Sequence, residues 1–231
     1  MQTVKQLRKT LLCAALCAAP LTAAQAAADL DLFYTPYTEI KQKNSTGDEL
    51  NFDDGDGWGA KGQFGLTDYL FLTGEYEKNK YDDITVNDTP LLPSAASSID
   101  LRVEQYRAGL GFNFVTTPFY VRGEYVGFDY KYRVDNGNSA SESDTQKDEG
   151  WGAHLGAKGK VLNDHVTLSA EVGYVDVGDS DGLEALAGAA YNITQHVGVF
   201  ADYRYTSLTA GKDEDLDTRL GEARVGARLS F

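Results

Sequence analysis

The chain has 231 residues and a formal net charge of −14, from 21 basic and 35 acidic residues. A chain this acidic is not expected to bind nucleic acid, because phosphate backbones attract basic surfaces. Hydrophobic residues make up 42% of the chain, and its length corresponds to one domain of roughly two hundred residues.

The first 26 residues have the pattern of a secretory signal peptide, which is removed on export. Lys5, Arg8 and Lys9 precede an apolar run at 11–21, and a small-x-small cleavage site ends at Ala26. Cleavage leaves 18 of the 21 basic residues against 35 acidic ones, a net charge of −17 (18 − 35). It also removes both cysteines, so no disulfide and no cysteine metal site are expected afterwards.

Residues 27–231 are expected to form a single domain made of strands. The first predicted strand is Leu30–Ile40, and Pro36 is a defect in it because proline has no backbone N–H to donate. A polar stretch at 42–56 follows and is expected to be a loop. No later run of 18 apolar residues occurs, so any membrane span must consist of strands, and only a closed barrel pairs all its backbone groups in lipid.

A two-strand unit of alternating apolar and polar residues recurs four times after the first strand. A turn of two to four residues joins the strands of each unit, as at Thr67-Asp68, whereas most connections between units are longer and acidic. One strand before the units and one after them bring the prediction to ten strands, with eight as the fallback. The units span 57–76, 106–125, 151–174 and 183–205, and the predicted loops are 42–56, 81–98, 134–149, 179–182 and 209–217.

The last predicted strand, 221–231, alternates between apolar and polar residues and ends on an aromatic one. Its apolar face includes Val225, Ala227, Leu229 and Phe231. Such a strand resembles the assembly signal of small bacterial outer-membrane β-barrels of the OmpA/OmpX type, which are porin-like proteins. The resemblance implies an all-β, ten-stranded antiparallel transmembrane barrel in the outer membrane of a Gram-negative cell. It also implies export through the general secretory pathway and insertion by the barrel-assembly machinery, which reads this strand.

Aromatic residues fall into two bands, as expected for the belts at the two membrane interfaces. A soluble β-sandwich or lipocalin-like barrel is the alternative, but its apolar face would point inward. The band toward the long loops contains Trp58, Tyr76, Tyr106, Tyr125, Trp151, Tyr174 and Tyr203, and the band toward the short turns contains Phe64, Phe112, Phe114, Phe119, Tyr191 and Phe231.

The polar face of such a barrel would fill its lumen with charges of both signs. Counting outward from Asp68 places Lys61 directly opposite Glu75, and similar counting places Arg107 opposite or diagonal to Glu124. Isolated charges would be costly in a narrow interior, so ion pairs are expected. The predicted lumen ion network contains Lys61, Glu75, Arg107, Glu124, Lys158, Glu171, Asp202 and Arg224, and the same alternation turns Arg122, Lys160, Arg204, Glu222 and Arg228 inward.

Three functions are compatible with this barrel. Paired charges that plug the lumen favour an envelope-structural or surface-interaction role, with acidic loops contacting lipopolysaccharide directly or through divalent cations. The same charges could instead line a narrow channel for small polar solutes. A hydrolase would need His154 with Ser169 and Glu171, but no nucleophile motif is present. We therefore predict a monomer that is not an enzyme and has no cofactor or metal site.

Overall fold

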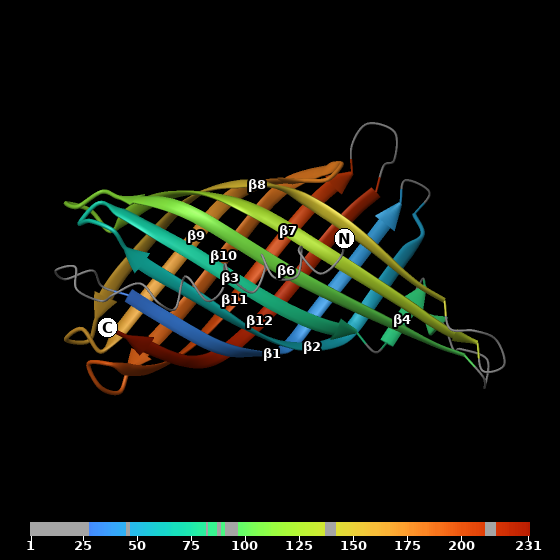
Figure 1. Ribbon diagram of the computed structural model, residues 1–231, viewed down its shortest axis with the longest axis horizontal. Helices are drawn as coiled ribbons and strands as arrows, with labels where there is room; N and C mark the ends of the chain where they lie inside the picture. The colour runs from blue at the N-terminus through green and yellow to red at the C-terminus, as the bar shows by residue number, and fades with distance from the viewer. Residues whose placement is uncertain are drawn as a thin grey trace, which may run out of the picture.

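The computed structural model describes residues 28–44, 47–81, 83–86, 89–90, 97–136, 142–210 and 216–231, and the predicted signal peptide lies outside these residues. Among them, no helix has the length and apolar character needed to cross a membrane. They form the strands drawn in Figure 1. The strands are β1 (Ala28–Asn44), β2 (Glu49–Gly65), β3 (Leu70–Tyr81), β4 (Asp83–Val86), β5 (Thr89–Pro90), β6 (Ser97–Asn113), β7 (Phe119–Asn136), β8 (Glu142–Val161), β9 (Val166–Val177), β10 (Ser180–Asn192), β11 (Val197–Ala210) and β12 (Leu216–Ser230).

Ten of these strands close into an antiparallel barrel, which confirms the predicted strand number. Their order around the wall is β1-β2-β3-β6-β7-β8-β9-β10-β11-β12, and β1 pairs with both β2 and β12. The seam between β1 and β12 runs from Asp29↔Ser230 to Asn44↔Leu216. The short strands β4 and β5 extend the sheet beyond the ring, where β4 pairs with residues 50–53 of β2. A closed ring leaves no strand edge exposed to lipid.

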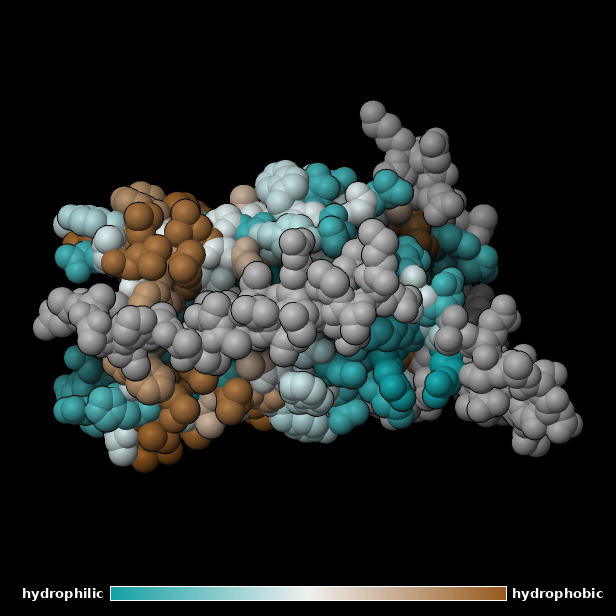
Figure 2. All heavy atoms as spheres, in the orientation of Figure 1, coloured by the Kyte–Doolittle hydropathy of each residue, from teal (hydrophilic) through white to brown (hydrophobic). Residues whose placement is uncertain are grey.

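Side chains alternate between the outer wall and the lumen along each strand. On β11, Tyr203 and Tyr205 are exposed, whereas Asp202, Arg204 and Thr206 are buried. The outer wall carries a broad apolar band toward the end with the short turns, and it becomes hydrophilic toward the other end (Figure 2). An apolar outer wall around a charged interior is the arrangement expected of a barrel in a membrane rather than in water.

Residues of both predicted aromatic bands lie on the outer wall. Near the loop end, three pairs of rings contact each other between neighbouring strands, with centroids about 6 Å apart. These pairs are Trp58–Tyr76 at 5.9 Å, Tyr106–Tyr125 at 6.1 Å and Trp151–Tyr174 at 6.0 Å. At the turn end, Phe64, Phe112, Phe114, Phe119, Tyr191 and Phe231 are all exposed. The two bands therefore occupy the positions at which interfacial belts are expected.

The strands continue past the apolar band into segments for which the sequence predicts loops. β1 ends at Asn44 and β2 begins at Glu49, so most of the predicted loop at 42–56 is strand. β7 and β8 occupy most of 134–149 in the same way. Only Gly178 and Asp179 join β9 to β10, and Gly178 has a φ of 60°, which a glycine adopts without strain. The loop predictions were wrong because backbone pairing between neighbouring strands continues beyond the apolar band of the outer wall.

Pro36 is accommodated by a β-bulge. The register of β1 against β12 shifts between Tyr34 and Tyr37, and its register against β2 shifts beyond Thr35. A bulge leaves one residue unpaired, so the missing N–H of proline costs no ladder hydrogen bond. Thr35 before the bulge and Thr38 after it are both fully buried in the lumen. The bulge therefore shifts the alternation by one residue and keeps the inner face of β1 continuous.

Candidate functional site

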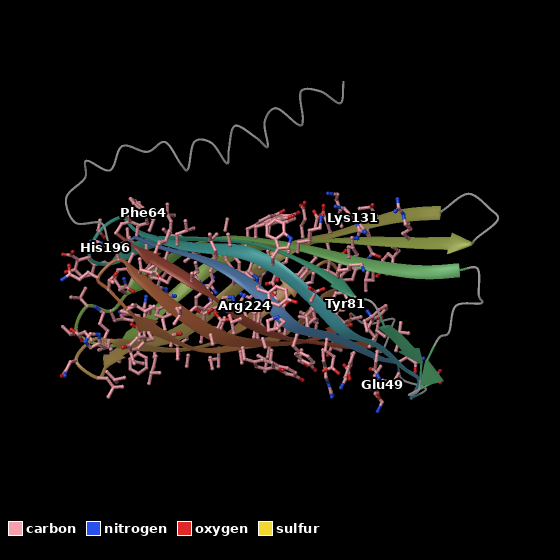
Figure 3. The ribbon with its side chains drawn as sticks, turned by 90° about the horizontal axis from the view of Figure 1, so that it is seen from below. Glu49, Phe64, Tyr81, Lys131, His196 and Arg224 are labelled. Atoms are coloured by element: carbon pink, nitrogen blue, oxygen red, sulfur yellow. The ribbon has the colours of Figure 1, made fainter. Side chains whose placement is uncertain are left out.

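The lumen is the candidate functional site, because charged side chains from most of the strands converge there. Figure 3 shows Arg224 inside the barrel, where its exposed fraction is 0%. Burying a single charge is costly unless it is paired, so the geometry of the pairs decides what the lumen can do. Of the predicted lumen ion network, Arg107, Glu124, Glu171, Asp202 and Arg224 are buried, and Lys61, Glu75 and Lys158 are partly exposed.

One group of ion pairs is centred on Arg224. Its Nε lies 2.6 Å from Asp202 Oδ1 and its Nη1 lies 3.0 Å from Glu75 Oε1. The backbone register sets Lys61 directly opposite Glu75, as predicted. Their side chains nevertheless form ion pairs with other strands: Lys61 with Asp202, and Glu75 with Arg224 and Arg204. The lumen is narrow enough that long side chains reach across it, so the nearest neighbour on the wall is not the preferred partner.

A second group is centred on Arg107. Its Nη1 donates to Glu124 Oε1 at 2.8 Å, and its guanidinium binds both oxygens of Glu184 at 2.7 and 2.6 Å. Glu124 lies two residues beyond the register partner of Arg107, the diagonal placement that the turn predicts. Arg122 bridges Glu124 and Glu171, and His154 lies 3.0 Å from Glu124. The two groups are joined through Arg204, which contacts Glu75 and Glu184.

Several residues of this network are absent from the predicted set. Glu184 accepts from Arg107 and from Thr206 Oγ1, and Glu77 accepts from Thr35 Oγ1 at 2.7 Å. Strand alternation was the signal for both, since each acid lies at an inward position of its strand. The contacts of Glu184 with Arg107 and of Glu77 with Thr35 carried no sequence signal, because each joins strands that are not neighbours.

A layer of apolar side chains lies above the ion network, toward the long loops. Tyr81, Leu101, Val126 and Val175 are at most 1% exposed. Val126 follows Glu124 by two residues on the inner face of β7, which places the layer next to the charges. Apolar packing inside the lumen was not predicted from the sequence. The layer consists of Ile40, Phe52, Tyr81, Leu101, Val103, Val126, Phe128, Val175, Val177, Leu208 and Leu220.

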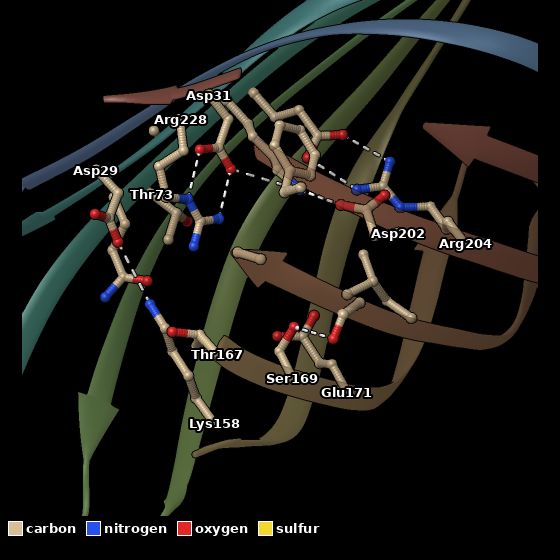
Figure 4. A pocket seen from close by; sticks show the side chains of 18 of the residues that line it. Asp29, Asp31, Thr73, Lys158, Thr167, Ser169, Glu171, Asp202, Arg204 and Arg228 are labelled. Atoms are coloured by element: carbon tan, nitrogen blue, oxygen red, sulfur yellow. Dashed lines mark hydrogen bonds and ion pairs between the residues drawn. The ribbon is translucent and has the colours of Figure 1, made fainter. Parts of the chain in front are cut away.

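A cavity of about 150 Å³ lies below the ion network, toward the short turns (Figure 4). Two ion pairs line its outer part: Asp31 with Arg228 at 2.7 Å, and Asp29 with Lys158 at 3.4 Å. Its inner wall includes Glu75 and other members of the network. Charged side chains and apolar ones such as Phe71 and Phe200 both line the cavity, which reaches as far as the buried charges.

Among the described residues, Glu124, His154 and Glu184 form a group of metal-binding residue types, with ligand atoms that lie within 4.8 Å of one another. The guanidinium of Arg107 already binds both of these carboxylates, so it occupies the place of a cation.

The hydrolase hypothesis requires contact between Ser169 and His154. Ser169 Oγ instead donates to the carbonyl of Gly188, and the ring nitrogens of His154 face Glu124 and Glu171. In this geometry Ser169 and His154 do not contact each other, and Arg107 bridges the carboxylates of Glu124 and Glu184.

A closed ten-stranded antiparallel barrel with an apolar wall and a charged interior is the architecture of an integral outer-membrane protein. The chain belongs to the family described as outer membrane protein beta-barrel domain, which matches residues 10–186. Its location is accordingly the outer membrane. No curated protein matches the chain by sequence.

Solved structures with the same fold are distant in sequence. The outer membrane protease OmpT from Escherichia coli has 9% identity and a TM-score of 0.58, with 91% of this chain and 99% of that chain covered. The translocator domain of the autotransporter NalP from Neisseria meningitidis has 13% identity and a TM-score of 0.51, with 100% and 97% covered. Ail, the attachment invasion locus protein of Yersinia pestis, has 14% identity and a TM-score of 0.45, with 87% and 99% covered. At these identities the likeness to the first two shows the fold alone.

Proposed function

We propose that this barrel has an envelope-structural or surface-interaction role and that its lumen is closed. The observation that carries the proposal is the stacking of two sealed layers in the lumen. The ion network contains Arg224 and Glu77 at 0% exposure, and the apolar layer above it contains Val126 at 0%. An ion that crosses this barrel would have to break buried pairs and then enter an apolar layer, and both steps are costly.

A narrow channel for small polar solutes is the competing function, and the cavity below the network is the feature that favours it. That cavity extends from the turn end only as far as Glu75, Arg107 and Arg204. It is therefore better explained as space left between the ion network and the short turns than as one half of a continuous passage.

Membership of the outer-membrane family supports the remaining parts of the proposal. The barrel acts as a monomer, with its long loops facing outward and its short turns in the periplasm. Its partners are outer-membrane lipid and lipopolysaccharide, and nucleic acid is not among them. It reaches the membrane through the general secretory pathway and carries out no catalysis, because the lumen holds its acids and bases in mutual ion pairs and holds His154 against Glu124 and Glu171.

The conductance of the purified protein in planar lipid bilayers tests the closed lumen. We expect a current close to the background of the bare bilayer, because an ion would have to cross both the buried ion network and the apolar layer. Simultaneous neutralisation of Arg107, Arg204 and Arg224 should raise the current. Steady conductance of the unmodified protein, with an ion selectivity that shifts on each single substitution, would support the channel instead.

Assembly supplies a second test. The backbone of Phe231 exchanges hydrogen bonds with Ala28 across the seam, and its ring is 64% exposed on the outer wall. If the apolar face formed by Val225, Ala227, Leu229 and Phe231 is the signal that the assembly machinery reads, Phe231→Asp should sharply reduce the heat-modifiable barrel in the outer membrane. Phe231→Tyr is the matched control and should assemble normally. Equal amounts of folded barrel from both variants would argue against this role.

A further inference from the structure

The ion network contains more acids than bases where it meets the apolar layer. Among the described residues, the group centred on Arg224 joins four acids to three bases. The acids are Glu75, Glu77, Asp202 and Glu222, and the bases are Lys61, Arg204 and Arg224. If all four acids were ionised, one buried carboxylate of this group would have no cation of its own.

The neighbouring parts of the lumen supply no further cation to this group. The group centred on Arg107 has three acids and two bases, and His154 faces acids of that group. Each of the two ion pairs beside the cavity has one acid and one base, and Lys160 is exposed at the turn end. The members of that second group are Glu124, Glu171, Glu184, Arg107 and Arg122, and the two pairs are Arg228 with Asp31 and Lys158 with Asp29.

Glu77 and Glu222 are the two acids of the group with the longer contacts to a cation. Arg224 Nη1 lies 3.0 Å from Glu75 Oε1 but 3.6 Å from Glu77 Oε2. Arg204 Nη1 lies 2.6 Å from Glu75 Oε1 but 3.6 Å from Glu222 Oε2. A distance of 3.6 Å is too long for a hydrogen bond. Both arginines therefore bind Glu75 closely and leave Glu77 and Glu222 with weaker ion contacts.

Of these two acids, Glu77 has the better support for a negative charge. Thr35 Oγ1 donates to Glu77 Oε1 at 2.7 Å, whereas Asn79 Nδ2 donates to Glu222 Oε1 at the longer distance of 3.3 Å. Glu77 Oε2 accepts no hydrogen bond from the described residues, so it is available to a donor. A protonated carboxyl group has one O–H to donate, and an ionised one has none. Glu222 is therefore the acid that is better suited to be neutral.

Two glycines on the inner face of β2 allow side chains of β12 and β3 to meet, although β1 and β2 separate these strands in the wall. Asn79 packs on Gly57, where a Cβ atom would clash with its Oδ1, and the ring of Tyr81 packs on Gly55. The hydroxyl of Tyr81 is hydrogen-bonded to that of Thr38 on β1 at 2.8 Å. The inner face of β2 therefore adds no charge at the level of Glu77 and Glu222.

The apolar layer begins directly beyond these two acids. Leu220 follows Glu222 by two residues toward the loop end of β12 and belongs to the layer, as does Tyr81 on β3. Figure 3 shows Tyr81 on the loop side of Arg224. Glu77 is 0% exposed and Glu222 is 5% exposed. Two negative charges at this boundary would repel each other without water to screen them.

We propose that Glu222 is a proton-binding site of the lumen, which holds a proton at neutral pH while Glu77 carries the negative charge. An ordinary glutamate is ionised at that pH, but two carboxyl groups that share a desolvated site do not both ionise. Release of the proton to water leaves a second carboxylate directly beneath the apolar layer. The layer should then loosen as the pH rises, so the closure of the lumen depends on this proton.

The charges around Glu222 come from several strands. Its register partners are Thr38 on β1 and Arg204 on β11. Arg204 and Arg224 favour the ionised form, whereas burial and the nearby acids of β3 favour the protonated form. The charged and titratable side chains of this region are Lys61 on β2, Glu75, Glu77 and Tyr81 on β3, Arg107 on β6, Glu184 on β10, Asp202 and Arg204 on β11, and Arg224 on β12.

The test is infrared spectroscopy of the barrel folded in lipid vesicles, recorded while the pH is raised, because a protonated carboxyl group has a C=O stretching band that a carboxylate lacks. We expect the unmodified protein to show this band at neutral pH and to lose it at alkaline pH. Glu222→Gln should lack the band at neutral pH. Glu77→Gln should lose it at a lower pH than the unmodified protein, because the repelling charge is gone. Glu171→Gln, the matched control, removes a buried carboxylate that is paired with Arg122 and should keep the band.

Equilibrium unfolding supplies a second readout. The native protein would bind one proton more than the unfolded chain above the ordinary range of glutamate, so its stability falls as the pH rises. The unfolding equilibrium constant of the unmodified protein should therefore rise, relative to that of Glu222→Gln, by about tenfold per pH unit between roughly pH 5 and 7.

A carboxyl band that is unchanged in Glu222→Gln, or a ratio of unfolding constants that does not vary with pH, would overturn the proposal. If Glu222→Gln does not fold, the unmodified protein and Glu77→Gln decide: no band at neutral pH, or a band that titrates identically in both, would overturn it. Bilayer conductance at neutral pH is measured separately. A conducting barrel that retains the band would refute the proposed closed lumen and leave the proton site in place.

Discussion

Replacement of Arg224 by Met is expected to lower the free energy of unfolding of the barrel by about 3–5 kcal/mol, since breaking a buried ion pair leaves its partner unpaired. Arg224 has no exposed surface and contacts Asp202 at 2.6 Å and Glu75 at 3.0 Å. It is also the cation nearest to Glu77, at 3.6 Å. Met fills a similar volume but leaves the buried carboxylates of Asp202 and Glu77, and the partly exposed one of Glu75, with less positive charge. Equilibrium unfolding in urea, with the protein refolded into lipid vesicles, measures the change.

Lys61→Gln is the matched control for this prediction. Lys61 also binds Asp202, but its side chain is 19% exposed, so water reaches it and the loss should be smaller. Adding Glu77→Gln to the Arg224→Met variant should restore part of the stability, because it removes one of the unpaired charges. Equal effects of Arg224→Met and Lys61→Gln would contradict a dry, ion-paired lumen and would favour one that is filled with water.

Ala187→Arg is expected to destabilise the barrel by about 2–4 kcal/mol, the cost of an arginine on the lipid face near the midplane. Ala187 is exposed on the outer wall of β10, midway between the outward residues Leu183 and Tyr191. No lumen residue can reach it, so the guanidinium would have to extend along the wall to the headgroups. Unfolding in urea from lipid vesicles again supplies the measurement.

Gln63→Arg is the corresponding change on the inner face. Gln63 lines the cavity at the turn end, where carboxylates such as Asp29 and Asp31 offer partners for a new cation. We expect a loss well below that of Ala187→Arg. A larger loss for Gln63→Arg would mean that the assignment of inner and outer faces is reversed along the strands.

The sequence by itself determined the parts of this protein that depend on local alternation. A strand has a period of two, so the inward and outward faces of each strand can be counted from the residues. Short turns set the register of neighbouring strands, which is why Lys61 lies opposite Glu75 as expected from the turn at Asp68. The recurring hairpins determined the number of strands, and the apolar outer face identified the membrane as the environment.

Only the tertiary structure decided which charges pair and what closes the lumen. The partner of Glu75 is Arg204 on β11 rather than Lys61 beside it, because closure of the ring brings distant strands within reach of a long side chain. The apolar layer around Val126 has the same origin. Apolar residues on the inner face of one strand cannot form a core by themselves. They pack together and exclude water only when several strands surround one axis. Alternation along the chain therefore determined which residues point inward, whereas closure of the barrel determined which of them contact one another.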